Sequence, residues 1–432
     1  MSSEWYSTTL GEICKFTTGS AFKTEHQGIS AGEYPFIKVS DMNLAGNEIF
    51  INHAQNFVSA EQKNAMKAKL HPIGSTVFAK IGVALQSNRR RLLVRPIIID
   101  NNMMSATPFD EKVSSRFLYF LLSTLDFNTI SAGSALPYLN VSDLQKINIE
   151  IPKDFKTQKE IEHILGALDD RITLLRETNA TLEAIAQALF KSWFVDFDPV
   201  RAKMEGRAPE GMDEATAELF PDSFEETELG VVPKGWRWGT LNDLATFQNG
   251  YAFKSKDWTD AGHPVVKIGD VKPGIIDLVG CSYVAEETVA GLDRFSLSRG
   301  NLLVGMTGYV GETGLVPKVE TAAYLNQRVG RLATKSGLAD LGYVYCAARS
   351  PEFKEFAVAQ SHGSAQANVS GTALMAFPVV IGSAPLLVQF NSVIAGILES
   401  VLTNHEEAQT LTTVRDTLLP RLISGQLNLT TH

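Results

Sequence analysis

The feature that most constrains this chain is a stretch from Gln158 to Phe197 that contains one glycine and no proline. Such a stretch predicts one long helix, because glycine and proline are the residues that most often end helices. Apolar side chains recur in it at alternating steps of four and three residues, which is typical of a coiled-coil seam. The seam consists of Ile161, Leu165, Leu168, Ile172, Leu175, Asn179, Leu182, Ala186, Leu189 and Trp193. One helix cannot bury so narrow a seam by itself, so a partner helix is required.

A second seam of the same kind lies near the end of the chain. It consists of Phe390, Ile394, Ile397, Val401, Asn404, Ala408, Leu411, Arg415, Leu418 and Leu422. Leu165 matches Ile394 at an offset of 229 residues, and this offset holds along the whole repeat. We interpret the match as an internal duplication. The alternative is two unrelated amphipathic helices on separate cores, and the constant offset argues against it.

The regions that precede the two helices also match each other. In order, Trp5, Leu10, Phe16, Gly19, Ala21, Phe22 and Lys23 correspond to Trp236, Leu241, Phe247, Gly250, Ala252, Phe253 and Lys254. The alternating residues 35–41 (PFIKVSD) correspond to residues 264–270 (PVVKIGD) and predict a strand in each copy, with Lys38 equivalent to Lys267. Further on, Asn101 matches Asn326, and GSALPYLNVS from Gly133 matches GSAQANVS from Gly363. Each copy is therefore predicted to be a β-rich domain followed by a long helix.

This duplication predicts the organisation of the whole chain. The predicted parts are a first domain at 1–156, a helix at 157–197, a linker at 198–233, a second domain at 234–386, a helix at 387–425 and a tail at 426–432. The linker is rich in proline and acidic residues, so we expect an extended connector with a short helix at 213–219 and little core. If the long helices pair antiparallel, the fold is α+β, with a β-rich domain at each end of an intramolecular coiled coil.

Charge and composition limit the class of protein. The net charge is −9, but residues 157–233 alone contain 17 acidic and 7 basic residues, so both β-rich domains are close to neutral and can present a basic face. No run of about 18 apolar residues and no signal-peptide pattern is found, which favours a cytoplasmic protein that does not enter a membrane. The three cysteines form no CxxC pair and are expected to be buried thiols.

Motifs for catalysis and for cofactor binding are missing from the sequence. Residues 300–307 have the glycine spacing of a P-loop, but Met306 stands where the phosphate-binding lysine is needed. The eight histidines show no metal-ligand spacing. The sequence DFDPV at 196–200 lacks the second proline of an amino-methyltransferase motif. We therefore predict a binding protein with no catalytic residue, no metal and no cofactor of its own.

A basic run in the first copy is the strongest candidate for binding DNA. Three adjacent arginines in SNRRRLLVR point in several directions on any backbone, so one or two should face a phosphate track, although a solvated loop is the plain alternative. The second copy is polar and glycine-rich at this point, which would suit a different half-site. The predicted DNA-binding residues are Lys23, Lys38, Gln86, Asn88, Arg89, Arg90, Arg91, Lys254, Lys267, Tyr309 and Arg328, of which Gln86, Asn88, Tyr309 and Arg328 are candidates for reading bases.

Apolar residues of the first helix that lie off the seam are candidates for binding a partner protein. They are Ile164, Leu174, Ile185, Phe190, Phe194 and Phe197. Some of them must cover the β-rich domains, and the remainder suggests a helix bundle completed by partner helices.

These features together resemble the specificity subunit of type I restriction-modification systems. ALFKSWFVDFDPVRAKMEG at 188–206 and LTTVRDTLLPRLISGQL at 411–427 resemble that family's central and distal conserved regions, and EWYSTTLGEI and GWRWGTLNDL resemble the starts of its two target-recognition domains. The resemblance implies a non-catalytic subunit whose two domains each read one half of a split DNA site. It also implies binding of two methylation subunits and of restriction (nuclease and translocase) subunits. The assembled enzyme, an adenine-specific methyltransferase and nuclease, would use S-adenosylmethionine, ATP and Mg.

Two other classes of protein are weighed against this family. A coiled-coil scaffold would not bind DNA, and salt-dependent binding to duplex DNA distinguishes it. A freestanding DNA-binding regulator would work without methylation subunits, and the apolar residues off the seam argue against it.

The asparagines predict the register of the helix pair. A buried asparagine is best satisfied by another polar group, so Asn179 should face Asn404 within hydrogen-bonding reach. In this register the one mismatch is Leu168 opposite Arg415, whose head is expected to reach water. The seam from Leu165 to Trp193 spans about 42 Å, or about 12 base pairs. Half-sites roughly one helical turn apart are therefore expected.

Overall fold

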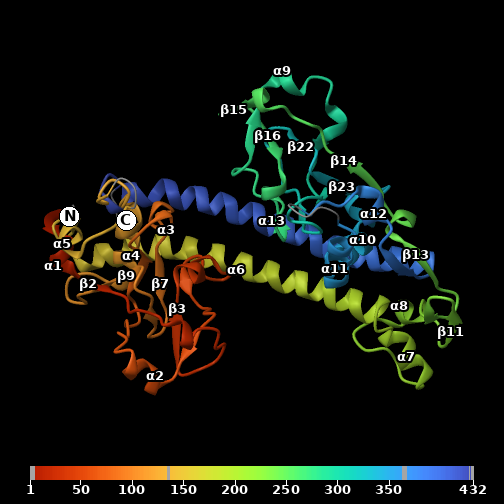
Figure 1. Cartoon of the computed structure of the whole chain (residues 1–432), viewed down its shortest axis with the longest axis horizontal. Coiled ribbons are helices and arrows are strands. Elements are labelled where there is room, and N and C mark those ends of the chain that lie inside the picture. Colours follow the sequence, from red (N-terminus) through yellow and green to blue (C-terminus); the bar gives the residue numbers. More distant parts are fainter. Residues whose placement is uncertain (1–4, 134–136, 362–366, 428, 430–432) are drawn as a thin grey trace. The chain divides into compact units, whose positions relative to one another are not determined.

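The computed structural model describes residues 5–133, 137–361, 367–427 and 429 (Figure 1). The chain divides into two compact units, of which unit 1 comprises Met1–Leu174 and Gln409–His432 and unit 2 comprises Leu175–Ala408. Each unit contains one β-rich region and one stretch of each long helix. Parts of the matching segments at Gly133 and Gly363, and parts of the predicted tail, lie outside the described residues.

The two long helices are α6 (Phe155–Phe194) and α13 (Ala384–Ile423), and each has 40 residues. Both were predicted, and their ends differ from the predicted ends by two or three residues. Helix α6 stops before Phe197 because the N–H groups of Val195 and Asp196 both bond to the carbonyl of Lys191, and Phe197 adopts a left-handed φ of 57°.

In unit 2 the register of the helix pair is as predicted. Asn404 Nδ2 donates to Asn179 Oδ1 at 2.9 Å, and Asn179 Nδ2 donates to the carbonyl of Val401 at 2.8 Å. Further along, the ring of Trp193 lies 5.3 Å from that of Phe390. Residue numbers rise on one helix as they fall on the other, so the antiparallel prediction is confirmed in this unit.

In unit 1 the helices are also antiparallel, because Ile161 and Leu165 share a core with Leu422. The prediction for Arg415 was incomplete. Its side chain remains 21% exposed, but its guanidinium also bonds Asp169 Oδ1 at 2.8 Å, and the Asp169 side chain is fully buried. The heptad pattern did not reveal this ion pair because Asp169 lies beside the seam and not on it.

Unit 1 is built on three small sheets. The five-stranded sheet has the order β2-β9-β6-β7-β4, the three-stranded sheet has the order β5-β3-β8, and β1 pairs with β10. The strands are β1 (Trp5–Thr9), β2 (Cys14–Thr18), β3 (Tyr34–Ile37), β4 (Phe50–Ile51), β5 (Phe57–Val58), β6 (Thr76–Ala79), β7 (Arg91–Leu93), β8 (Ile98–Ile99), β9 (Met103–Pro108) and β10 (Asn148–Pro152). The short helices are α1 (Leu10–Ile13), η1 (Thr24–His26), η2 (Val39–Asn43), α2 (Ala60–Ala65), α3 (Val83–Gln86), α4 (Ser115–Thr124) and α5 (Val141–Gln145).

Unit 2 repeats this plan. Its sheets have the orders β14-β23-β20-β21-β17 and β15-β18-β16-β22-β19, β13 pairs with β24, and β11 pairs with β12. The strands are β11 (Phe224–Thr227), β12 (Gly230–Pro233), β13 (Arg237–Thr240), β14 (Thr246–Asn249), β15 (Trp258–Thr259), β16 (His263–Val266), β17 (Gly274–Ile275), β18 (Ser282–Val284), β19 (Ser296–Leu297), β20 (Leu302–Gly305), β21 (Thr313–Leu315), β22 (Ala323–Leu325), β23 (Val329–Ala333) and β24 (Pro378–Ile381). The short helices are α7 (Asp198–Met204), α8 (Glu214–Glu218), η3 (Leu241–Asp243), η4 (Ser255–Asp257), η5 (Ile268–Asp270), α9 (Glu286–Val289), η6 (Asp293–Phe295), η7 (Gly337–Asp340), α10 (Gly342–Ala348), α11 (Pro351–Ala359) and α12 (Gly371–Met375).

The strand pairings support the duplication. In the sheet β2-β9-β6-β7-β4 of unit 1 and the sheet β14-β23-β20-β21-β17 of unit 2, the second strand pairs antiparallel with the first and third, and the last two strands pair parallel. The predicted strands at 35–41 and 264–270 are shorter than expected. Each ends at a turn in which an aspartate accepts the N–H of the lysine three residues earlier, Asp41 from Lys38 at 2.6 Å and Asp270 from Lys267 at 2.8 Å.

The predicted linker at 198–233 is a folded part of unit 2. Its short helix, α8, was expected, but α7 and the hairpin β11–β12 were not. Val200, Phe220 and Val232 are buried, and the ring of Phe220 lies 5.1 Å from that of Trp193. The expectation of little core was wrong, because these widely spaced apolar residues pack into the same core as residues of α6 and α10.

All three cysteines are buried free thiols, as predicted. By length and composition alone, α13 could cross a membrane, although 39% of its most apolar window is buried within the structure. Because its seam packs against α6, we regard it as the core helix of a folded protein.

Candidate nucleic-acid interface

The three adjacent arginines of unit 1 have different environments. Arg90 is 4% exposed, and its guanidinium lies 3.7 Å from the ring centre of Phe127 and donates to the carbonyl of Leu125 at 2.9 Å. Burial lowers the pKa of the Arg90 guanidinium to about 9. This side chain cannot reach a phosphate, so its assignment to the DNA surface is corrected.

Asn88 is also a structural residue. It adopts a left-handed φ of 52°, and its Oδ1 accepts from the Phe127 N–H at 3.0 Å and from Arg90 at 3.0 Å. Its Nδ2 donates to the carbonyl of Leu125 at 3.2 Å. Its donors and acceptor are thus engaged inside unit 1, which contradicts the prediction that Asn88 reads a base.

The other residues of the run lie nearer the surface. Arg91 is half-buried and donates through Nε and NH2 to the carbonyl of Met42 at 3.2 and 3.0 Å. Arg89 is exposed and bonds Asn43. Gln86 is exposed at the end of α3. Arg89 and Gln86 remain predicted DNA contacts, whereas two of the donors of Arg91 are bonded to the last turn of η2.

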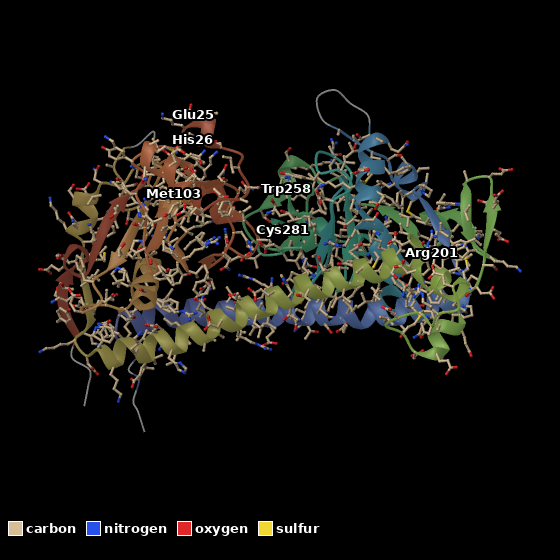
Figure 2. The ribbon with its side chains drawn as sticks, turned by 90° about the horizontal axis from the view of Figure 1, so that it is seen from below. Glu25, His26, Met103, Arg201, Trp258 and Cys281 are labelled. Atoms are coloured by element: carbon tan, nitrogen blue, oxygen red, sulfur yellow. The ribbon has the colours of Figure 1, made fainter. Side chains whose placement is uncertain are left out.

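The four predicted lysines form two equivalent pairs. Lys23 and Lys254 are exposed. The ammonium group of Lys23 lies 3.5 Å from the carboxylate of Glu25. Figure 2 shows Glu25 and His26 on the surface of unit 1. Lys267 is held at 3.5 Å over the ring of Trp258 and donates to Ser282. Lys38 likewise lies over Phe22 and bonds Gln27. The first pair is therefore open to a ligand, and the second is partly held by its own unit.

Tyr309 and Arg328 lie in two loops of unit 2, β20–β21 and β22–β23, which are bonded to each other. Tyr309 is 60% exposed in the turn that follows β20. Arg328 is exposed, and its NH1 bonds Thr307 Oγ1 at 3.3 Å. Both remain predicted base-reading residues. We call Tyr309, Arg328 and the exposed Asn368, whose Oδ1 accepts from Thr307 Oγ1 at 2.6 Å, the unit 2 tip.

The backbone around this tip is held by three segments. Gly308 has a φ of 71° and donates to the carbonyl of Ala367 at 3.0 Å. Thr307 forms an isolated bridge with Asn368. The carbonyl of Arg328 accepts from the N–H of Met306 at 3.1 Å.

Unit 1 has the same arrangement of backbone bonds. Gly82 has a φ of 74° and donates to the carbonyl of Pro137 at 2.8 Å, and Ile81 forms an isolated bridge with Tyr138. The carbonyl of Asn102 accepts from the N–H of Lys80 at 2.9 Å. The residues at the positions of Tyr309, Arg328 and Asn368 are therefore Val83, Asn102 and Tyr138, which we call the unit 1 tip.

Sequence reasoning missed the unit 1 tip. The match of Asn101 to Asn326 was displaced by one residue. In equivalent turns, the carbonyl of Asp100 accepts from the N–H of Met103, and the carbonyl of Asn326 accepts from the N–H of Val329. Corrected by one position, the alignment would have paired Asn102 with Arg328. The matching segments at Gly133 and Gly363 already carried a signal for Tyr138 and Asn368.

The predicted partner-binding residues fall into two groups. Leu174 and Ile185 are 51% and 44% exposed on α6, and Ile164 packs partly on the core of unit 1. Phe190, Phe194 and Phe197 are buried in the core of unit 2. For these three the prediction of a free apolar surface is corrected, because the globular part of unit 2 covers them.

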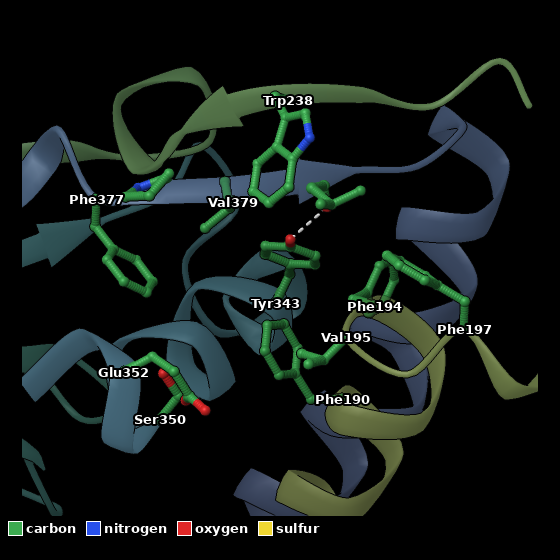
Figure 3. Close-up of a pocket in the computed structure, with 12 residues that line it drawn as sticks. Phe190, Phe194, Val195, Phe197, Trp238, Tyr343, Ser350, Glu352, Phe377 and Val379 are labelled. Atoms are coloured by element: carbon green, nitrogen blue, oxygen red, sulfur yellow. Dashed lines mark hydrogen bonds between the residues drawn. The ribbon is translucent and has the colours of Figure 1, made fainter. Parts of the chain in front are cut away.

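The three phenylalanines do line one wall of a pocket in unit 2 (Figure 3). The pocket has a volume of about 360 Å³ and is completed by Val195, Trp238, Tyr343, Glu352 and residues 377–380. Tyr343 donates to the carbonyl of Val380 at 2.6 Å. Within the described part of the chain, Nε1 of Trp238 is buried without a hydrogen-bond partner.

A second, polar pocket of about 240 Å³ lies in unit 1 between the arginine run and the helix pair. It contains the Asp169–Arg415 ion pair, and Asp169 Oδ2 has no partner among the described residues. Burial raises the pKa of the Asp169 carboxyl, although the Arg415 guanidinium acts in the opposite direction. The pocket therefore holds a buried charge that Arg415 chiefly balances, with a further contribution from the Arg116 guanidinium.

The described residues show no arrangement for catalysis by a thiol or a bound metal. Burial raises the pKa of the Cys14 thiol to about 12, far from that of a nucleophile. Over the same residues, no group of three histidine, cysteine or acidic side chains could hold a metal ion.

Comparison with known proteins agrees with this picture. The chain matches the family described as type I restriction modification DNA specificity domain twice, over residues 2–184 and 233–414. It is 26% identical to the type I restriction enzyme HindI specificity subunit of Haemophilus influenzae, over 90% of this chain and 96% of that protein. It is 25% identical to the MjaIX specificity subunit of Methanocaldococcus jannaschii, over 97% of this chain and 91% of that protein.

Among solved structures, the chain is similar in fold to the S subunit of a type I restriction-modification system from M. genitalium. The TM-score is 0.55 at 16% identity, and the match covers 97% of this chain and 96% of that one. Since the two family matches cover most of the sequence, the chain belongs to the type I restriction-modification DNA specificity family and is a non-catalytic specificity subunit.

Proposed function

We propose that this subunit recognises a split duplex DNA target, with unit 1 reading one half-site and unit 2 the other. The observation that carries the proposal is the duplication. The two units share strand order and tip backbone but differ in their tip side chains. Equivalent scaffolds with different exposed side chains suit two different base sequences.

Binding strength would come mainly from contacts with phosphate. The exposed cations Lys23, Lys254 and Arg89 are the side chains best placed for such contacts within their units. Replacing any one of these cations with alanine should weaken binding to all sequences alike and reduce the salt slope by about one unit.

The same chain would dock two methylation subunits and the restriction subunits. The exposed Leu174 and Ile185 on α6, and Val388 and Val393 on α13, are apolar side chains without a covering element in unit 1 or unit 2 as described. The assembled enzyme, located in the cytoplasm, would supply S-adenosylmethionine, ATP and Mg through its other subunits, and this chain would bind none of them.

Sequencing of methylated adenines in a host that carries this chain and its methylation subunits tests the proposal. The expected result is one motif of two short half-sites separated by a fixed gap of unspecified bases, absent when the chain is deleted. A continuous motif, or an unchanged methylation pattern after deletion, would contradict it. A coiled-coil scaffold, the alternative weighed from the sequence, would also show no salt-dependent binding to duplex DNA.

A further inference from the structure

The two tips carry side chains that are largely exposed to solvent. Val83 is 81% exposed and Tyr309 is 60% exposed, although both follow a strand in the centre of a sheet. Tyr138 is 42% exposed, and Asn102, Arg328 and Asn368 are exposed as well. Large side chains held at the surface on a braced backbone are available to a ligand.

The brace makes each tip rigid. In unit 1 the turn at Gly82 is bonded on one side to residues 137–139 and on the other to Asn102. In unit 2 the turn at Gly308 is bonded in the same way to residues 367–369 and to Arg328. A rigid backbone places side chains without a large loss of conformational entropy on binding.

Residues that are the same in both units and residues that differ between them suit different kinds of contact with DNA. The exposed lysines are the same residue type at equivalent positions, as in Lys23 and Lys254, which suits a phosphate backbone that is the same everywhere. The tips differ at all three positions. Only positions that differ can make the two units prefer different base pairs.

The chemistry of the tip residues matches base edges. An arginine can bond O6 and N7 of guanine, an asparagine can bond N6 and N7 of adenine, and an apolar side chain can contact the thymine methyl group. Arg328 and Asn368 in unit 2, and Asn102 and Val83 in unit 1, supply these groups. One hydrogen bond from Arg328 to Thr307 orients a guanidinium that has five N–H donors.

We propose that the two tips are the base-reading elements, so that Val83, Asn102 and Tyr138 determine the sequence of one half-site and Tyr309, Arg328 and Asn368 that of the other. This assignment rests on the proposed function of split-site recognition. It adds four residues that were not predicted from the sequence, namely Val83, Asn102, Tyr138 and Asn368, and it no longer includes Asn88 as a reader of bases.

The test uses the full chain assembled with its methylation subunits. Methylation by S-adenosylmethionine is measured on a DNA library in which every position of both half-sites is randomised. Arg328→Ala should reduce discrimination at one base pair of one half-site by about tenfold to a hundredfold and leave the other half-site unchanged. Asn102→Ala should do the same in the opposite half-site.

Matched controls remove surface groups that lie outside the tips. Lys335→Ala and Val358→Ala change exposed side chains of unit 2 and should leave the preference for every base pair unchanged. If Arg328→Ala and Asn102→Ala lower methylation of all sequences alike while the split motif persists, the tips do not read bases and the assignment fails alone. If the wild-type complex selects no split motif, the proposed function fails with it.

Discussion

At the scale of single residues, Arg90 shows how position in the fold decides what a charge does. Arg90→Ala would remove a stacked guanidinium and leave the carbonyl of Leu125 with the longer bond from the Asn88 amide, so we expect the free energy of unfolding to fall by about 2 to 4 kcal/mol. Arg89→Ala, at an exposed position next to it, should change stability by less than about 0.5 kcal/mol. Chemical unfolding of both variants measures this difference. Equal stability of the two variants would show that Arg90 is not a structural residue.

His71 provides a prediction about pH. It is 1% exposed, its Nδ1 lies 2.7 Å from Ser105 Oγ, and burial lowers the pKa of His71 to about 4. The unfolded chain then binds a proton between pH 6.5 and 4 that the folded chain does not, so His71 stabilises the fold above about pH 6.5 and this contribution is lost as the pH falls towards 4.

The measurement is urea unfolding at pH 7 and pH 4.5 for the wild type and for His71→Gln. The wild type should lose about 2 to 3 kcal/mol more than the variant, since each pKa unit corresponds to about 1.4 kcal/mol. Carboxyl groups titrate in both proteins and cancel in the comparison. Equal losses of unfolding free energy in the two proteins would mean that the pKa of His71 is not lowered by folding.

Residue types alone predicted the chemistry of the site but not which side chains are exposed. The run of arginines predicted a basic surface element, but Arg90 is buried, and its burial depends on Phe127, which is distant in the sequence. The same holds for Phe190 and Phe194, whose burial depends on the ring of Tyr343. Contacts between residues far apart in sequence have no local pattern.

At the scale of elements, the Asp169–Arg415 pair is the contact in which the duplicated helix pair differs most. At the repeat offset of 229 residues, the equivalent residues of unit 2 are Leu398 and Ala186, both fully buried. Removing one member of a buried ion pair costs about 3 to 5 kcal/mol, whereas replacing both with apolar residues is often neutral or stabilising.

Arg415→Ala should therefore destabilise the protein by about 3 to 5 kcal/mol, because it leaves the Asp169 carboxylate buried and unbalanced. The double variant Asp169→Leu with Arg415→Ala copies the residues of unit 2 and should recover most of that loss. Unfolding midpoints in denaturant test both variants. A double variant as unstable as the single one would show that the pair is needed for its shape and not for its charge.

The helices were the elements best predicted from the sequence. Their seam has a period that only a helix can present to one partner, and two buried asparagines can satisfy each other in one register. The segment at 198–233 was predicted poorly. Its few apolar residues, such as Val200 and Phe220, do not form a periodic pattern and become core only beside Trp193 and Trp236.

At the scale of the whole molecule, the duplication would let one chain serve the two half-sites that we propose. The strand orders and the tip bonds repeat, so the backbone of one unit predicts the backbone of the other. The backbone plan could be inferred from the matching sequences. The full set of tip residues could not. Tyr309 and Arg328 were predicted, but Asn368 and the unit 1 tip were not, because divergent positions are the ones that an internal comparison aligns least well.

The last prediction concerns the gap between half-sites, which we expect the two long helices to determine. Residues 172–178 of α6 and residues 405–411 of α13 include the borders between the units and face each other in the register that the asparagines define. Deleting both segments removes one heptad from each helix and keeps Asn179 opposite Asn404. The helix pair becomes shorter by about 10 Å, which equals about three base pairs.

Sequencing of methylated adenines should then show both half-site sequences unchanged and a gap that is shorter by up to about three base pairs. Deleting only residues 172–178 shifts one seam against the other, puts Asn404 opposite an apolar residue, and should abolish assembly, which makes it the control for register. A folded double-deletion protein that methylates the original motif with the original gap would show that the helices hold the units together but do not measure the distance between the half-sites.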